Sequence, residues 1–184
     1  NRLIGFGRYA GIVGAYNGLR AFGIREKSFE LEKVETLPDY AALKQELKKV
    51  QLPKLKIVLT GFGKVARGAR EILEELNLKE VNVQDYLVND FDEAVFCQID
   101  VLDYNKRKDG KNLDRYDFYN NPDEYESDFM RFAKVSDLFI AGHFYGDGAP
   151  FLFTREDAKK TEFKINLVAD ISCDIDGPVA STIR

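Results

Sequence analysis

Short apolar runs alternate with longer amphipathic stretches along this chain. Four mostly apolar runs predict buried β-strands, at residues 55–60, 94–99, 138–141 and 165–172. The shorter run Val-Asn-Val-Gln-Asp at 81–85 predicts one more strand, the second along the chain. Most of these runs are continuously apolar rather than alternating with polar residues. They therefore indicate a parallel sheet that is covered on both faces.

The stretches between the strands have helical spacing. We predict a helix over residues 8–22 that ends at Gly23, a second over 38–50 and a third over 64–76. The alternation of strands and helices predicts an α/β fold, a Rossmann-like doubly wound parallel sheet with flanking helices. Ligands of such sheets bind at the carboxyl ends of the strands.

The first predicted helix is rich in small residues, namely Ala10, Gly11, Gly14, Ala15 and Gly18. Each glycine inside a helix costs roughly 1 kcal/mol relative to alanine. A helix that keeps three of them needs another backbone or a ligand close by. We interpret the small residues as a surface for close helix packing, with direct ligand contact as the alternative.

Residues 103–127 are strongly polar, and the charges at 105–111 are mixed in sign. This composition indicates a solvated loop or insertion rather than a binding patch. Asn-Pro-Asp-Glu at 121–124 predicts the start of a helix. The side chains that this helix would turn toward the core are Tyr125, Phe129, Phe132 and Ala133. Thr154 and Asp157 form a partial capping box, which predicts another short helix.

Composition and charge exclude several classes of function. The 184 residues suit one domain, and the net charge of -4 disfavours a nucleic-acid partner, which requires a basic surface. Cys97 and Cys173 match no metal spacing, and we expect both thiols to stay reduced. His143 is the single histidine, which excludes a multi-histidine metal site.

The start of the chain resembles neither a signal peptide nor a membrane span. The apolar stretch at 3–22 contains Arg8, Asn17 and Arg20, which a span would not carry centrally. We therefore expect a cytoplasmic protein without a membrane partner. The first residue is Asn1 rather than Met, so we expect a piece of a longer protein.

The sharpest local motif is Thr-Gly-Phe-Gly-Lys-Val-Ala-Arg-Gly at 60–68, between a predicted strand and a predicted helix. Gly61, Gly63 and Ala66 fit the three small positions of the dinucleotide-binding fingerprint. Such a turn brings backbone N–H groups and the helix dipole to a pyrophosphate, and Lys64 and Arg67 add positive charge. A purely structural turn is the alternative.

The fingerprint also requires an acidic residue about 20 residues further on, at the end of the next strand. Asp85 has this position in the predicted order of elements. Its carboxylate would accept hydrogen bonds from an adenosine ribose and repel a 2′-phosphate, which favours NAD over NADP. Asp90 or Asp92 could serve instead, and Asp85 could be a surface acid without this role.

Four separated segments resemble one family in order and content. They are GFGRYAGIVGA at 5–15, GKVARGA at 63–69, FIAGHFY at 139–145 followed by Ala-Pro-Phe at 149–151, and VADISCD at 168–174. Together they resemble the lysine-forming saccharopine dehydrogenases of the alanine dehydrogenase and transhydrogenase superfamily. The polar stretch is outside the resemblance.

The resemblance implies an enzyme of two Rossmann-like domains with its active site between them. Residues 1–184 would form the NAD-binding domain, with 1–50 as a connecting helical region and 55–184 as the Rossmann-like core. The amino-terminal domain, which carries the family's acid–base Lys and His, would be absent, so the catalytic residues are unknown here. The implied reaction converts saccharopine, NAD and water to lysine, 2-oxoglutarate and NADH.

Fingerprint and resemblance together give a set of site residues. The implied cofactor contacts are Gly61, Gly63, Lys64, Asp85, His143, Asp170, Ile171, Ser172 and Cys173, and the implied substrate contacts are Arg2, Phe6, Phe144 and Tyr145. The chain departs from the family at His143, where an apolar residue is usual, and it lacks an Arg shortly after Asp85. Because of these departures, the resemblance does not fix the exact substrate.

Several alternatives stay open from the sequence. His143 could replace the missing acid–base group, whereas a carboxylate pair of Asp170 with Asp174 and a nucleophilic Cys173 have weaker support. The substrate could be another amino acid, such as alanine. The chain could also be a non-catalytic NAD-binding module.

Overall fold

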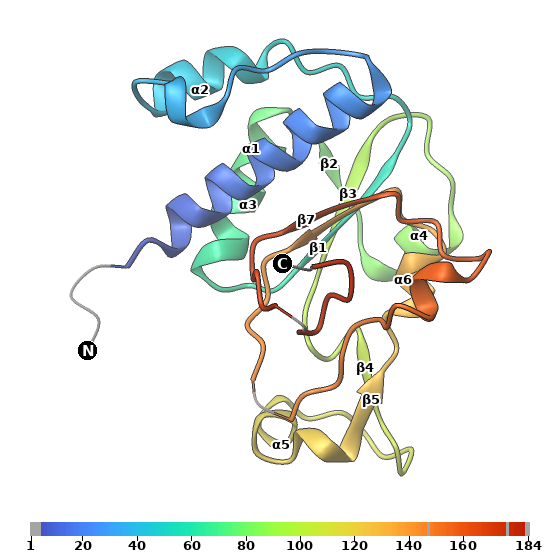
Figure 1. Cartoon of the computed structure of the whole chain (residues 1–184). Coiled ribbons are helices and arrows are strands. Elements are labelled where there is room, and N and C mark those ends of the chain that lie inside the picture. Colours follow the sequence, from blue (N-terminus) through green and yellow to red (C-terminus); the bar gives the residue numbers. More distant parts are fainter. Residues whose placement is uncertain (1–4, 147, 176, 183–184) are drawn as a thin grey trace.

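The computed structural model describes residues 5–146, 148–175 and 177–182. Its centre is a five-stranded sheet in the order β2-β3-β1-β6-β7, in which every neighbouring pair is parallel (Figure 1). The strands are β1 (Lys56–Thr60), β2 (Lys79–Glu80), β3 (Val95–Ile99), β6 (Leu138–Ala141) and β7 (Leu167–Asp170). The predicted α/β doubly wound sheet is thereby confirmed.

Helices cover both faces of this sheet (Figure 1). One face carries α1 (Gly7–Glu26), α2 (Tyr40–Leu47) and α3 (Lys64–Glu75), and the other carries α4 (Val83–Val88) and α6 (Met130–Ala133). Alternate residues of β1 divide between the two cores: Ile57 and Leu59 pack toward α1 and α3, and Val58 packs toward α4 and α6. The described residues also contain three short 3-10 turns, Val34–Thr36, Pro122–Glu124 and Asp157–Lys159.

The glycines of α1 and α3 bring the two helix backbones into direct contact. A Cβ atom on Gly11 would lie 1.9 Å from the carbonyl oxygen of Val65, and one on Gly68 would lie 1.9 Å from that of Arg8. These glycines therefore serve close helix packing, as we predicted for the small residues of the first helix.

The first helix ends later than predicted. It continues past Gly23 to Glu26, and Lys27 ends it in the left-handed conformation with φ 52°. Gly23 has a packing role instead, because a Cβ atom there would lie 2.4 Å from the carbonyl oxygen of Phe29.

The strand predicted at residues 81–85 is wrong. The second strand is the pair of exposed residues Lys79 and Glu80, and the helix α4 begins directly after Asn82. The Asn82 side chain caps this helix by accepting a hydrogen bond from the Asp85 backbone N–H at 2.9 Å. The cap stabilises the first turn of a helix where the valines alone suggested a strand.

The polar stretch, predicted as a solvated loop or insertion, is an insertion with secondary structure of its own. It contains an antiparallel hairpin of β4 (Asn105–Arg107) and β5 (Tyr125–Ser127), with α5 (Arg115–Asn120) between the strands. Figure 1 shows the hairpin and α5 at the end of the molecule away from α2. Buried aromatic rings beneath the polar surface, those of Tyr104 and Phe118, hold it to the core.

The helix predicted to start at residue 121 is also wrong, because the chain forms a 3-10 turn there and then enters β5. The side chains that were expected to face the core are nevertheless buried: Tyr125, Phe129, Phe132 and Ala133. Near residue 154 the predicted capping box is present. Thr154 Oγ1 accepts from the Asp157 N–H at 3.1 Å, but the helix that follows is only a 3-10 turn.

Among the residues that the structure describes, no helix is both long enough and apolar enough to cross a bilayer. Within the same residues, no group of His, Cys, Asp and Glu side chains could hold a metal ion.

Candidate functional site

A cleft of about 840 Å³ opens at the carboxyl ends of β1, β3, β6 and β7. Its walls are residues 61–65 after β1, Asp100, Val101 and Tyr104 after β3, residues 142–145 after β6, and Ile171, Ser172 and Asp174 after β7. Residues 5–7 border it beside α1, and Arg115 and Tyr119 border it from α5. Strand β1 lies between β3 and β6, so the connections leave this point in opposite directions, as at the ligand sites of other doubly wound sheets.

The two loop glycines have different roles. Gly61 adopts φ +94°, and a Cβ atom there would lie 2.8 Å from the Gly142 carbonyl oxygen and 2.9 Å from the His143 Cα. Its backbone is fixed to β3, since its N–H donates to the Ile99 carbonyl at 2.8 Å. Gly63 has an ordinary φ of -75°, and a Cβ atom on it would meet nothing within 4 Å. Gly61 is therefore required by the turn itself, whereas Gly63 leaves open space.

The amino terminus of α3 faces this open space. Gly63 is its N-cap residue, and no side chain caps the helix. Uncapped N–H groups and the positive end of the helix dipole attract an anion. Lys64 lines the cleft, and the exposed Arg67 follows in the first turn of the helix. The donor set at this end of the cleft thus suits a phosphate or pyrophosphate group.

His143 lies buried in the wall of the cleft. Its Nδ1 is 2.7 Å from the Thr60 hydroxyl oxygen, and its ring packs edge-to-face against Tyr104. Its Nε2 is buried and has no hydrogen-bond partner among the described residues. Burial lowers the pKa of His143 to about 4, although the nearby Asp170 carboxylate acts in the opposite direction. The imidazole is therefore neutral at pH 7.

The buried imidazole predicts a pH dependence of stability. The unfolded chain binds a proton at His143 near its ordinary pKa of 6.5, whereas the folded chain binds one only near a pKa of about 4. Stability from this group is thus present above pH 6.5 and is lost as the pH falls toward 4, by about 3 kcal/mol. We expect the free energy of unfolding, measured with urea at several pH values in this range, to depend less on pH in His143→Gln than in the wild type. The same pH dependence of the free energy of unfolding in both proteins would contradict the burial of this imidazole.

The structure brings most of the sequence-predicted site residues together. The cleft is lined by Phe6, Gly61, Gly63, Lys64, His143, Phe144, Tyr145, Ile171 and Ser172. Phe6 and Phe144 are largely exposed at its mouth. Cys173 lies between two lining residues, exposed and with φ 51°, but does not itself line the cleft. Arg2 lies outside the described residues.

Asp85 is not at the cleft, and this corrects the sequence-based placement. It lies in the first turn of α4, where its carboxylate accepts from the side-chain amides of Asn82 at 2.6 Å and Asn89 at 3.3 Å. The Asn89 carbonyl in turn accepts from Lys56 Nζ at the amino end of β1. The alternative Asp92 lies at this end too, paired with Lys54. This is the opposite end of the sheet from the glycine loop.

Asp100 is the acid that sequence reasoning missed. It directly follows β3, which is the strand that pairs with β1, and it lines the cleft beside the glycine loop. One carboxylate oxygen accepts from the Leu102 N–H at 2.8 Å, and the other pairs with Arg115. The available signal was an acid immediately after the apolar run at 94–99, but the sequence does not show that this strand neighbours β1.

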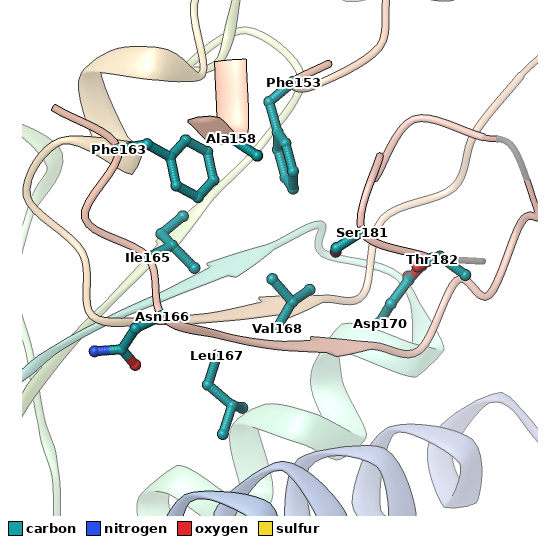
Figure 2. A pocket seen from close by; sticks show the side chains of 10 residues that line it. All are labelled: Phe153, Ala158, Phe163, Ile165, Asn166, Leu167, Val168, Asp170, Ser181 and Thr182. Carbon is teal, nitrogen blue, oxygen red and sulfur yellow. The ribbon is translucent and has the colours of Figure 1, made fainter. Parts of the chain in front are cut away.

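Asp170 has a structural task next to the cleft. Its carboxylate accepts hydrogen bonds from the Ser172 hydroxyl, the Cys173 N–H and the Thr182 hydroxyl, which fixes the chain after β7. It also borders a separate cavity of about 340 Å³ along β7, where Phe153, Phe163 and other apolar side chains face one another (Figure 2). Asp170 therefore shapes the cleft through its neighbours rather than by lining it.

Comparison with known proteins identifies no family for this chain. The sequence matches no protein-family model, and a search of curated proteins found none with significant sequence similarity.

Proposed function

We propose that the cleft binds the dinucleotide NAD(H), and that the chain is the nucleotide-binding domain of an oxidoreductase. One observation carries this proposal: Gly63, at the N-cap of α3, leaves open space between the helix terminus and the cleft. A pyrophosphate needs such an approach to backbone N–H groups, and any side chain at this position would obstruct it.

The lining residues divide between the parts of the dinucleotide. Gly63 and Lys64 would meet the pyrophosphate at the terminus of α3. Asp100 would accept hydrogen bonds from the adenosine ribose, which is the role that the fingerprint assigns to an acid after the neighbouring strand. The neutral His143 and the exposed Phe144 would lie at the nicotinamide end.

The reaction is proposed from the resemblance to saccharopine dehydrogenases. When bound, NAD would accept a hydride from an amine substrate, and hydrolysis of the resulting imine by water would release lysine and 2-oxoglutarate. This chain contributes binding and orientation of the cofactor. With a pKa of about 4, His143 is poorly matched to proton transfer near neutrality, so we do not assign it the acid–base role.

The experiment is a fluorescence titration of NADH against the chain and two aspartate variants. Asp100→Ala removes the proposed ribose acceptor and should weaken NADH binding about tenfold, the effect of losing a charged hydrogen-bond partner. Asp85→Ala is the matched control, because it removes the same charge at the other end of the sheet, and its affinity should equal that of the wild type. Equal loss in both variants would count against the proposed orientation.

A further inference from the structure

The folded polar stretch contributes a wall of the cleft. Residues Arg115 and Tyr119 lie one turn apart on α5, and both line the cleft. Arg115 pairs with Asp100, so the insertion meets the sheet at the acid to which we assign the ribose. The Asp100 side chain is 19% exposed, whereas the Arg115 side chain is 60% exposed.

The insertion holds Arg115 in a defined place. Its base is tied to the end of β3, where the Asp103 carboxylate accepts from the Asp100 N–H at 2.8 Å and the Asn105 amide donates to the Val101 carbonyl at 2.9 Å. Helix α5 starts at a capping aspartate, Asp114, which accepts from the Asp117 N–H at 2.8 Å.

The middle of the insertion is anchored as well. Phe118 on α5 is buried, with its ring centroid 5.1 Å from that of Tyr125 on β5. The Tyr125 hydroxyl donates to the Asp117 carboxylate at 2.6 Å, which ties the hairpin to the helix. Arg115 is the first residue of this anchored helix, and its exposed side chain is directed to the cleft by the pairing with Asp100.

We propose that Arg115 sets the selectivity of the cleft between NAD(H) and NADP(H), an inference that rests on the proposed function. A lone Asp100 carboxylate would repel a phosphate on the ribose 2′-oxygen. The Arg115 guanidinium neutralises that carboxylate and has further N–H donors for the phosphate. The cleft therefore accepts both dinucleotides, and the insertion is the element that admits the phosphorylated one.

Titrations of NADH and NADPH against wild type, Arg115→Ala and Arg115→Lys test this inference. Arg115→Ala should weaken NADPH binding about 10- to 100-fold and change NADH binding by less than about threefold. Arg115→Lys keeps the charge without the planar guanidinium, so its NADPH affinity should lie between those of the wild type and Arg115→Ala. Lys111→Ala is the matched control: it removes a positive charge from the same insertion outside the cleft, and should change neither affinity.

The possible outcomes distinguish a failure of the role of Arg115 from a failure of NAD(H) binding itself. An unchanged ratio of NADPH to NADH affinity in Arg115→Ala overturns the role of Arg115 and leaves the proposed function standing. So does a wild-type chain that binds NADH but not NADPH. A wild-type chain that binds neither overturns both. Thermal melting of each variant identifies any loss of fold, and Arg115→Lys, which keeps a positive charge at this position, is a second variant that tests the role.

Discussion

Replacing Gly68 with alanine should destabilise the chain by about 3 kcal/mol or more, a large fraction of the stability of a domain this size. The added Cβ atom would lie 1.9 Å from the Arg8 carbonyl oxygen and 3.1 Å from the Ile12 backbone nitrogen. Both obstacles belong to the backbone of α1, so no side-chain rotation relieves the clash. The helices must separate, and the core between them loses contact.

Urea unfolding measures this loss directly. Gly11→Ala should give a similar loss, because its Cβ atom meets the Val65 carbonyl oxygen from the other helix. Gly63→Ala is the matched glycine-to-alanine control: its Cβ atom meets nothing within 4 Å, so its stability should stay near that of the wild type. A fully stable Gly68→Ala variant would show that α1 and α3 do not pack backbone to backbone.

Replacing Gly63 with valine should weaken NADH binding at least about 100-fold, or by about 2.7 kcal/mol, while the protein still folds. Its backbone conformation, with φ -75°, is one that valine readily adopts, and the site of the new side chain is open in the protein. The methyl groups would occupy the space that we assign to the pyrophosphate and would cover the terminus of α3.

Gly61→Val provides the contrast. Gly61 has φ +94° and backbone atoms within 3 Å of a Cβ position, so this variant should lose stability and binding together. Thermal melting and NADH titration of the two variants distinguish a binding role from a folding role. If Gly63→Val bound NADH as the wild type does, the glycine loop would be a structural turn only.

Much of the fold could be predicted because burial leaves a direct mark on the sequence. Strands β1, β3 and β6 are fully buried and the edge strand β7 is partly buried, and all four appear as mostly apolar runs. The edge strand β2 consists of exposed Lys79 and Glu80, which give no apolar run. The valines just after it, Val81 and Val83, therefore predict the strand at the wrong place. The Asn82 side chain caps the segment that follows, which forms helix α4.

The site was only partly predictable, for a related reason. The glycine motif is local, so Gly61, Gly63 and Lys64 could be placed from sequence spacing. The position of the acid that we assign to the ribose depends on which strand neighbours β1. The order along the chain suggested the segment at 81–85, whereas β3 is the neighbour. The ion pair of Asp100 with Arg115 depends on how the insertion folds, which mixed charges did not reveal.

The most direct test of the account is an NADH titration of the wild-type chain followed by backbone-amide NMR. We expect saturable binding, with the largest shift changes at residues 61–65, 100–104 and 142–145, around the cleft. Absence of saturable binding would contradict the account. Shift changes confined to the cavity beside β7 (Figure 2) would contradict it too, because that cavity is separate from the glycine loop.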